Sequence, residues 1–126
     1  MRGRSSAAEV AEAIAAEGGA RAYRALLQLA DDLAAVDAGA RVALSAEEPV
    51  AEVGRWLDAI AGIVEMRLRE VGAPAPVWVV ACGGDPGSKW EPDRGVTLPE
   101  PADEVLVPEP LRRRGVMIEA SELRSV

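Results

Sequence analysis

The chain has 126 residues, of which 49% are apolar and 28% charged, and its formal net charge is −7. This length predicts one domain with a single modest hydrophobic core. The absence of histidine removes the commonest general base and metal ligand, and the lone Cys82 rules out an internal disulfide or a thiolate zinc site. No segment has the pattern of a signal peptide or a membrane-spanning helix, so we expect a soluble, cytoplasmic protein without membrane contact.

The first two predicted elements are helices over residues 7–17 and 20–36. Ser6 and Glu9 have the spacing of a capping box, in which each side chain accepts a hydrogen bond from the other residue's free amide. The glycine pair at 18–19 ends the first helix, because glycine readily leaves the helical conformation. The second helix carries apolar residues at helical spacing and should bury that face.

The main helix is predicted over residues 49–71, after an optional short turn at 41–44. Pro49 sets its start, since proline lacks an amide hydrogen and is accepted only in the first turn of a helix. Gly72 sets its end. Aliphatic and aromatic residues of this segment recur at helical spacing, so one face must be covered.

The remainder, residues 73–126, is predicted to be an irregular arm laid over a helical core formed by residues 1–72. Eight of the nine prolines lie at or beyond Pro74, which disfavours long regular elements. Residues 77–81, 104–107 and 116–118 favour brief strands, whereas 110–115 and 121–123 favour single helical turns. The expected fold is therefore mainly α: a three-helix core with an extended, Pro/Gly-rich C-terminal arm and at most a small strand pair.

The expected core consists of the large apolar side chains on the inner faces of these helices and one tryptophan of the arm. They are Tyr23, Leu26, Leu27, Leu33, Trp56, Leu57, Ile60, Ile63, Val64, Leu68 and Trp78.

No pattern of catalytic residues stands out. The segment 83–89 has the glycines of a phosphate loop but the order Gly-Ser-Lys, where a Walker loop needs Gly-Lys-Ser/Thr opening a helix. Cys82 lacks a histidine that could act as its base and is better explained as a small buried apolar residue. We therefore expect a protein that is not an enzyme and that binds no cofactor or metal.

Trp90 and the run Arg112, Arg113 and Arg114 are the candidate partner-binding residues, since tryptophan and arginine are enriched at binding hot spots. Packing of Trp90 against the core is an equally good explanation, and the arginines could instead form a solvated helix end or contact phosphate. If the arm is the binding element, a chain truncated after Ala81 should stay folded and lose its partner. Loss of the helical signal would instead make the arm a structural cover.

Several segments carry a family resemblance: 21–49, 55–60, 74–78, 111–118 and 121–123. In these the chain resembles small actinobacterial proteins that are often encoded beside nucleotidyltransferase-like toxin genes, although 82–99 departs from the aromatic-rich stretch expected there. The resemblance implies an antitoxin-like or regulatory partner protein. With the acidic net charge, it leads us to expect a protein-binding module that neutralises a basic, co-encoded toxin. A DNA-binding transcriptional regulator is the alternative, and a homodimer is compatible with either.

Overall fold

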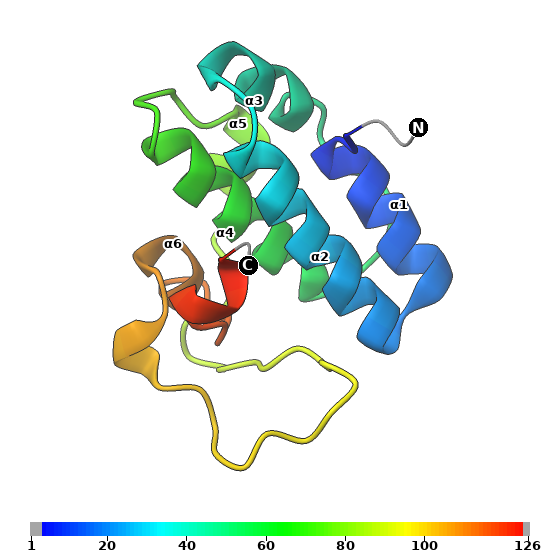
Figure 1. Ribbon diagram of the computed structural model, residues 1–126, viewed down its shortest axis with the longest axis vertical. Coiled ribbons are helices and arrows are strands. Elements are labelled where there is room, and N and C mark those ends of the chain that lie inside the picture. Colours follow the sequence, from blue (N-terminus) through cyan, green and yellow to red (C-terminus); the bar gives the residue numbers. More distant parts are fainter. Residues whose placement is uncertain (1–3, 125–126) are drawn as a thin grey trace.

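The computed structural model describes residues 4–124 and is mainly helical, which confirms the predicted fold class (Figure 1). Within this range the helices are α1 (Ala7–Glu17), α2 (Gly19–Ala34), α3 (Ala38–Ser45), α4 (Trp56–Arg69), α5 (Val77–Ala81) and α6 (Glu109–Arg112). Two short 3-10 turns follow in the C-terminal part, η1 (Glu104–Leu106) and η2 (Ala120–Leu123). None of these described helices is both long and apolar enough to cross a membrane.

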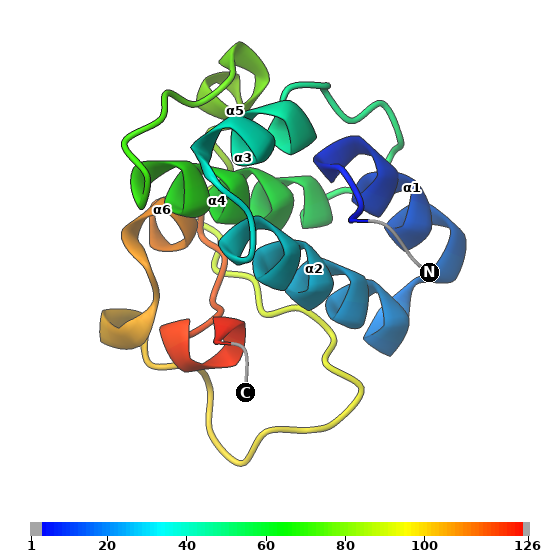
Figure 2. The same ribbon diagram turned by 45° about the horizontal axis from the view of Figure 1, so that its top comes forward.

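Helices α1 and α2 form an antiparallel pair that packs against α4 (Figures 1 and 2). The predicted capping box begins α1: the Glu9 amide donates to Ser6 Oγ over 3.1 Å, and the Ser6 amide donates to Glu9 Oε1 over 2.9 Å. The predicted bounds of α1 are therefore confirmed, and those of α2 hold to within two residues at its C-terminal end.

The predicted start of the main helix at Pro49 is wrong, because α4 begins seven residues later, at Trp56. Pro49 is buried in the loop between α3 and α4 instead. The predicted end is close to the observed one. The Ala73 amide donates to the Leu68 carbonyl and the Gly72 amide to the Arg69 carbonyl, with Gly72 at φ 66°. This is a Schellman motif, which requires a left-handed residue that glycine adopts without strain.

Two further helices form where the sequence predicted other structures. The optional turn at 41–44 is part of the eight-residue α3, whose first turn is capped by Asp37 through a 2.9 Å bond from the Ala40 amide. The strand predicted at 77–81 is the short helix α5. A lone strand would leave its amides without partners, whereas α5 pairs them internally, for example Val80 N with the Pro76 carbonyl.

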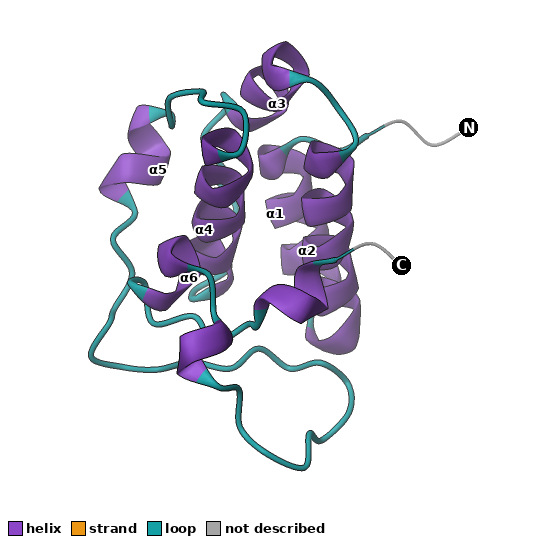
Figure 3. Cartoon of the chain, turned by 60° about the vertical axis from the view of Figure 1, so that its left-hand side comes forward, coloured by secondary structure: helices purple, strands orange, loops and turns teal. Residues whose placement is uncertain are grey.

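Strand pairing in the described residues is limited to one isolated parallel bridge between Trp90 and Val116. The strand predicted at 104–107 is largely replaced by η1, and the segment 116–118 is extended without forming a ladder. The arm therefore has little regular structure, and its long loop between α5 and α6 reaches away from the helices (Figure 3).

The core lies between α1, α2 and α4, and the arm completes it. Eight of the eleven predicted core side chains are buried, whereas Leu27, Trp56 and Leu57 are only partly buried. The arm adds buried apolar side chains that the sequence did not indicate. They are Val79, Val107, Leu111, Val116, Met117, Ile118 and Leu123.

Candidate functional site

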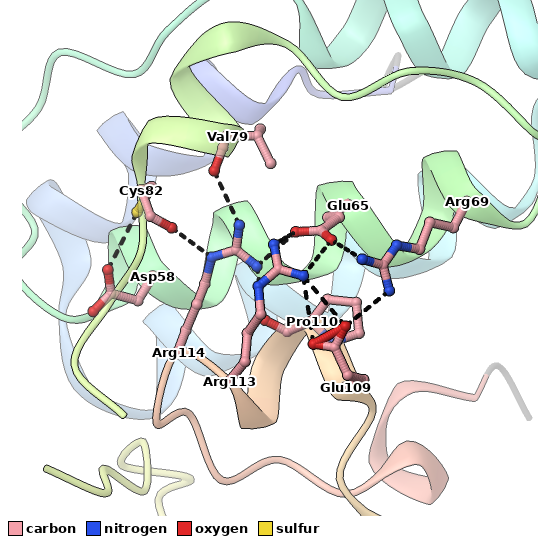
Figure 4. Close-up of polar contacts among 9 residues, drawn as sticks. All are labelled: Asp58, Glu65, Arg69, Val79, Cys82, Glu109, Pro110, Arg113 and Arg114. Carbon is pink, nitrogen blue, oxygen red and sulfur yellow. Dashed lines mark hydrogen bonds and ion pairs between the residues drawn. The ribbon is translucent and has the colours of Figure 1, made fainter. Parts of the chain in front are cut away.

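The arginine run predicted to contact a partner begins in α6 and ends in the turn behind it. Arg114 has no exposed surface. Its guanidinium donates to three backbone carbonyls, those of Cys82 at 2.6 Å, Pro110 at 2.7 Å and Val79 at 3.0 Å (Figure 4). In this fold Arg114 cannot reach a partner, and its prediction as a contact residue is corrected. Arg114 is instead an internal clamp, which joins the backbone of α6 to that of α5.

Glu65 of α4 is the acidic partner of this clamp and is itself 6% exposed. Its Oε1 lies 2.8 Å from Arg114 Nη1, and its Oε2 lies 2.7 Å from Arg113 Nη1 and 2.5 Å from Arg69 Nη2 (Figure 4). Burial raises the pKa of Glu65, but the hydrogen bonds from Arg113 and Arg114 outweigh it, and the net pKa is lowered. Glu65 is therefore a stable carboxylate that holds α6 against α4.

Arg112 and Arg113 remain at the surface, but both have bonds within the chain. Arg113 pairs with Glu65 and Glu109, which raises its pKa, and its side chain is 42% exposed. Arg112 is partly buried and donates to the Val107 carbonyl over 3.1 Å. The basic run is thus largely used to attach α6 and its flanking turns.

Trp90, the other predicted contact residue, is partly buried. Its ring meets that of Trp56 edge to face, with centroids 5.1 Å apart and an interplanar angle of 84°. The Arg55 guanidinium lies 6.0 Å from the Trp90 ring centroid. The Trp90 backbone pairs with Gly115 and Met117 over 2.8 Å in each case. These contacts favour the packing explanation of Trp90 over that of an exposed anchor.

The segment around Cys82 offers no nucleophile or phosphate cradle. The Cys82 thiol lies 3.2 Å from Asp58 Oδ1 (Figure 4), and burial followed by this hydrogen bond raises its pKa to about 11. The thiol is therefore protonated near neutral pH. In the glycine-rich turn that follows, the Asp85 amide donates to the Arg114 carbonyl, and Lys89 pairs with Glu104 over 2.9 Å. Among the described residues, no group of three or more metal-ligating side chains gathers.

A surface that the sequence did not indicate lies at the end of the molecule formed by α3, the following loop and α5. We call it the α3–α5 surface. It combines exposed valines with exposed carboxylates: Val42, Val50, Val77, Val80, Glu47, Glu48 and Glu52. The predicted strand at 77–81 hid this surface, because strand spacing does not place Val77 and Val80 on one side, whereas positions i and i+3 of a helix do.

A second exposed apolar group lies on the arm, at Val96, Leu98, Val105 and Leu106. Beside it, a surface pocket of about 480 Å³ is lined by residues that include Lys89, Glu104 and Met117. In that pocket Lys89 forms an ion pair with Glu104, and the other acidic lining residues, Glu91 and Asp103, accept hydrogen bonds within the chain. Comparison of the chain with protein-family models, curated proteins and solved structures returned no match.

Proposed function

We propose that this chain is a non-catalytic protein-binding module, of antitoxin type, that neutralises a basic partner encoded nearby. The observation that carries the proposal concerns charge: most basic side chains form ion pairs within the chain, whereas several carboxylates have no such partner. The resemblance to proteins encoded beside nucleotidyltransferase-like toxins supplies the class of partner.

Nine of the thirteen basic side chains in the described part of the chain form ion pairs with acidic side chains. They are Arg21, Arg41, Arg55, Arg67, Arg69, Lys89, Arg94, Arg113 and Arg114. By contrast, six carboxylates in the same residues have neither an ion pair nor a hydrogen bond, namely Glu12, Asp31, Glu47, Glu48, Glu52 and Glu100. The charge left for a partner is therefore negative, which favours and steers a basic protein.

The same distribution disfavours the DNA-binding alternative. The four described arginines without an acidic partner, Arg4, Arg24, Arg112 and Arg124, are spread along the chain, and Arg112 already donates to a carbonyl. A nucleic-acid interface needs several cations along one groove or helix to neutralise successive phosphates. The run at 112–114 was the only candidate for such a cluster, and one of its three members, Arg114, is buried.

The direct test is affinity purification of the tagged chain from its native host, followed by identification of co-purifying protein by mass. We expect a basic protein, the product of a neighbouring gene, at a fixed ratio to the tagged chain. A DNA fragment covering the chain's own promoter serves as the comparison ligand. Tight, steeply salt-dependent binding of that fragment, with the chain otherwise recovered alone, would replace this proposal by the DNA-binding one.

A further inference from the structure

Helix α5 presents two large apolar side chains to solvent although it is firmly held. Val77 is 86% and Val80 69% exposed, whereas the residues between them, Trp78 and Val79, are buried. Trp78 Nε1 donates to the Ser45 carbonyl over 2.9 Å, and Arg114 donates to the Val79 carbonyl over 3.0 Å. The exposed valines therefore lie on a turn that is already ordered. A partner that binds there loses less free energy to the ordering of this segment.

The α3–α5 surface extends beyond this turn. The bond from Trp78 to Ser45 joins α5 to the end of α3, and Figure 2 shows both helices at the same end of the molecule. Val42, 40% exposed, lies one turn before Ser45 on α3, and Val50, 84% exposed, lies in the loop that follows. The four exposed valines thus come from α3, α5 and the loop that follows α3.

Carboxylates on this surface indicate which partner it fits. Glu47, Glu48 and Glu52 are exposed and are half of the described carboxylates that lack any bond within the chain. The nearby Arg41 does not compensate them, because it is buried and pairs with Glu70 over 2.9 Å. An apolar face with uncompensated negative charge is complementary to a segment that carries both apolar side chains and lysine or arginine.

A second copy of this chain fits the surface poorly. In a symmetric dimer the same patch faces itself, so the three carboxylates would oppose each other without a free cation on α3, α5 or the loop between α3 and α4. We infer that the α3–α5 surface is the docking site for a basic, apolar segment of a protein partner. This inference rests on the proposed function and assigns its interface.

Matched variants of the chain test the inference in affinity purification and in titration against the partner that the wild type captures. The apolar variant is Val77→Ser/Val80→Ser, and the charge variant is Glu47→Gln/Glu48→Gln/Glu52→Gln. Their controls alter exposed residues elsewhere: Val105→Ser/Leu106→Ser on η1, and Glu12→Gln/Glu100→Gln on α1 and the long loop of the arm. Circular dichroism should show the same helical signal in all four, because the substituted side chains lie at the surface.

We expect the apolar variant to bind roughly tenfold more weakly or worse. The charge variant should bind roughly tenfold more weakly at low salt, and this difference should shrink as salt increases. Both controls should stay within about twofold of the wild type.

Photo-crosslinking locates the contact. With Val80 replaced by benzoyl-phenylalanine, we expect a crosslink to a lysine- or arginine-rich partner peptide, and with Val105 so replaced, none. If the wild type captures a partner that all four variants hold equally, or if Val80 crosslinks to a second copy of this chain, the docking site is wrong while the binding function stands. If the wild type captures no partner, the proposed function itself falls, and this inference with it.

Discussion

The N-terminal helices and the C-terminal arm are held in the same molecule by different interactions. Helices α1, α2 and α4 pack through aliphatic side chains, and Leu26, Leu33 and Ile60 have no exposed surface. The arm also buries apolar side chains, but arginines attach its irregular backbone at several points. Arg55 of the turn before α4 donates to the carbonyls of Ser88 and Arg114, over 2.7 Å in each case.

Further arginines do the same along the arm. Arg67 of α4 donates to the Leu123 carbonyl over 3.1 Å, and Arg94 donates to the Met117 carbonyl over 2.9 Å while pairing with Glu122. A backbone without helix or sheet leaves many carbonyls in need of donors, and a guanidinium supplies five N–H groups in a rigid fork. The chain's strong preference for arginine over lysine therefore has a structural role, because the arginines donate hydrogen bonds to the carbonyls of the arm.

Truncation after Ala81 is the largest perturbation of this arrangement. It removes the arm side chains that close the core over α2 and α4, including the fully buried Leu111 and Ile118. We expect loss of cooperative unfolding and of much of the helical circular dichroism signal, which is the outcome that makes the arm a structural cover and not a separate binding element. A cooperative, fully helical fragment would show that the arm is dispensable and that apolar packing in the first half suffices.

Replacement of Arg114 tests how much its hydrogen bonds and ion pair contribute to the stability of the protein. Arg114→Ala leaves the buried carboxylate of Glu65 with less compensation and removes the side-chain hydrogen bond to each of three carbonyls. We expect a loss of about 3–5 kcal/mol in the free energy of unfolding, measured by urea denaturation. Arg112→Ala, which removes one carbonyl contact at the surface, is the control and should cost about 1 kcal/mol or less. Equal losses in the two variants would contradict the assignment of Arg114 as the clamp.

Gly84 tests how closely the arm backbone must approach this clamp. It has φ 67°, and an added Cβ would lie 2.5 Å from the Arg114 carbonyl oxygen. Gly84→Ala should therefore destabilise the protein by about 1–3 kcal/mol in thermal or urea unfolding. Gly83→Ala is a matched control, because a Cβ at Gly83 meets no atom within 4 Å. If both substitutions have the same small effect, the turn can shift and the approach is not required.

Acid should weaken the charged attachments more than the apolar packing. Burial raises the pKa of Glu65, but hydrogen bonds from Arg113 and Arg114 outweigh it and lower the pKa below the ordinary value of 4.5. In the same way, burial raises the pKa of Glu122, and hydrogen bonds from Arg94 and Tyr23 lower it below 4.5. Their contribution is fully present above the unfolded pKa and is lost as pH falls through the lower folded values.

The urea midpoint should therefore fall between about pH 5 and pH 3. Glu122→Gln should flatten this dependence, whereas Glu12→Gln, at a position with no bond, should leave it unchanged. An unaltered slope in Glu122→Gln would mean that the carboxylate does not contribute through its charge.

The smallest expected effect concerns Cys82, at the junction of α5 and the long loop. Because its pKa is raised to about 11, its reaction with a thiol reagent near neutral pH should be much slower than that of an unfolded control in urea. Asp58→Asn removes the carboxylate that accepts its hydrogen bond and should speed the reaction. Rapid labelling of the folded wild type would show that this junction opens and that the clamp is looser than its contacts indicate.

Helices with strong local signals were predictable, and those without were not. The capping box and the glycines around α1 act within a few residues, so the sequence located that helix correctly. Pro49 was a misleading start signal for α4, because its burial in a loop is decided by contacts that the sequence does not display. Residues 77–81 have strand-favouring side chains, yet residues 4–124 contain no second strand to pair with them, and helix α5 forms instead.

By itself the sequence determined the helical class, most of the core side chains on the long helices and the negative charge, because periodicity, capping and side-chain polarity are local properties. Only the tertiary structure decided which charges remain available to a partner. The run 112–114 looks equally exposed along the sequence, but Glu65, far away on α4, buries one of its members and holds a second. Val77 and Val80 became a candidate surface only when Trp78 and Val79 turned inward. Burial and pairing depend on which distant segments meet, and the local pattern does not contain that information.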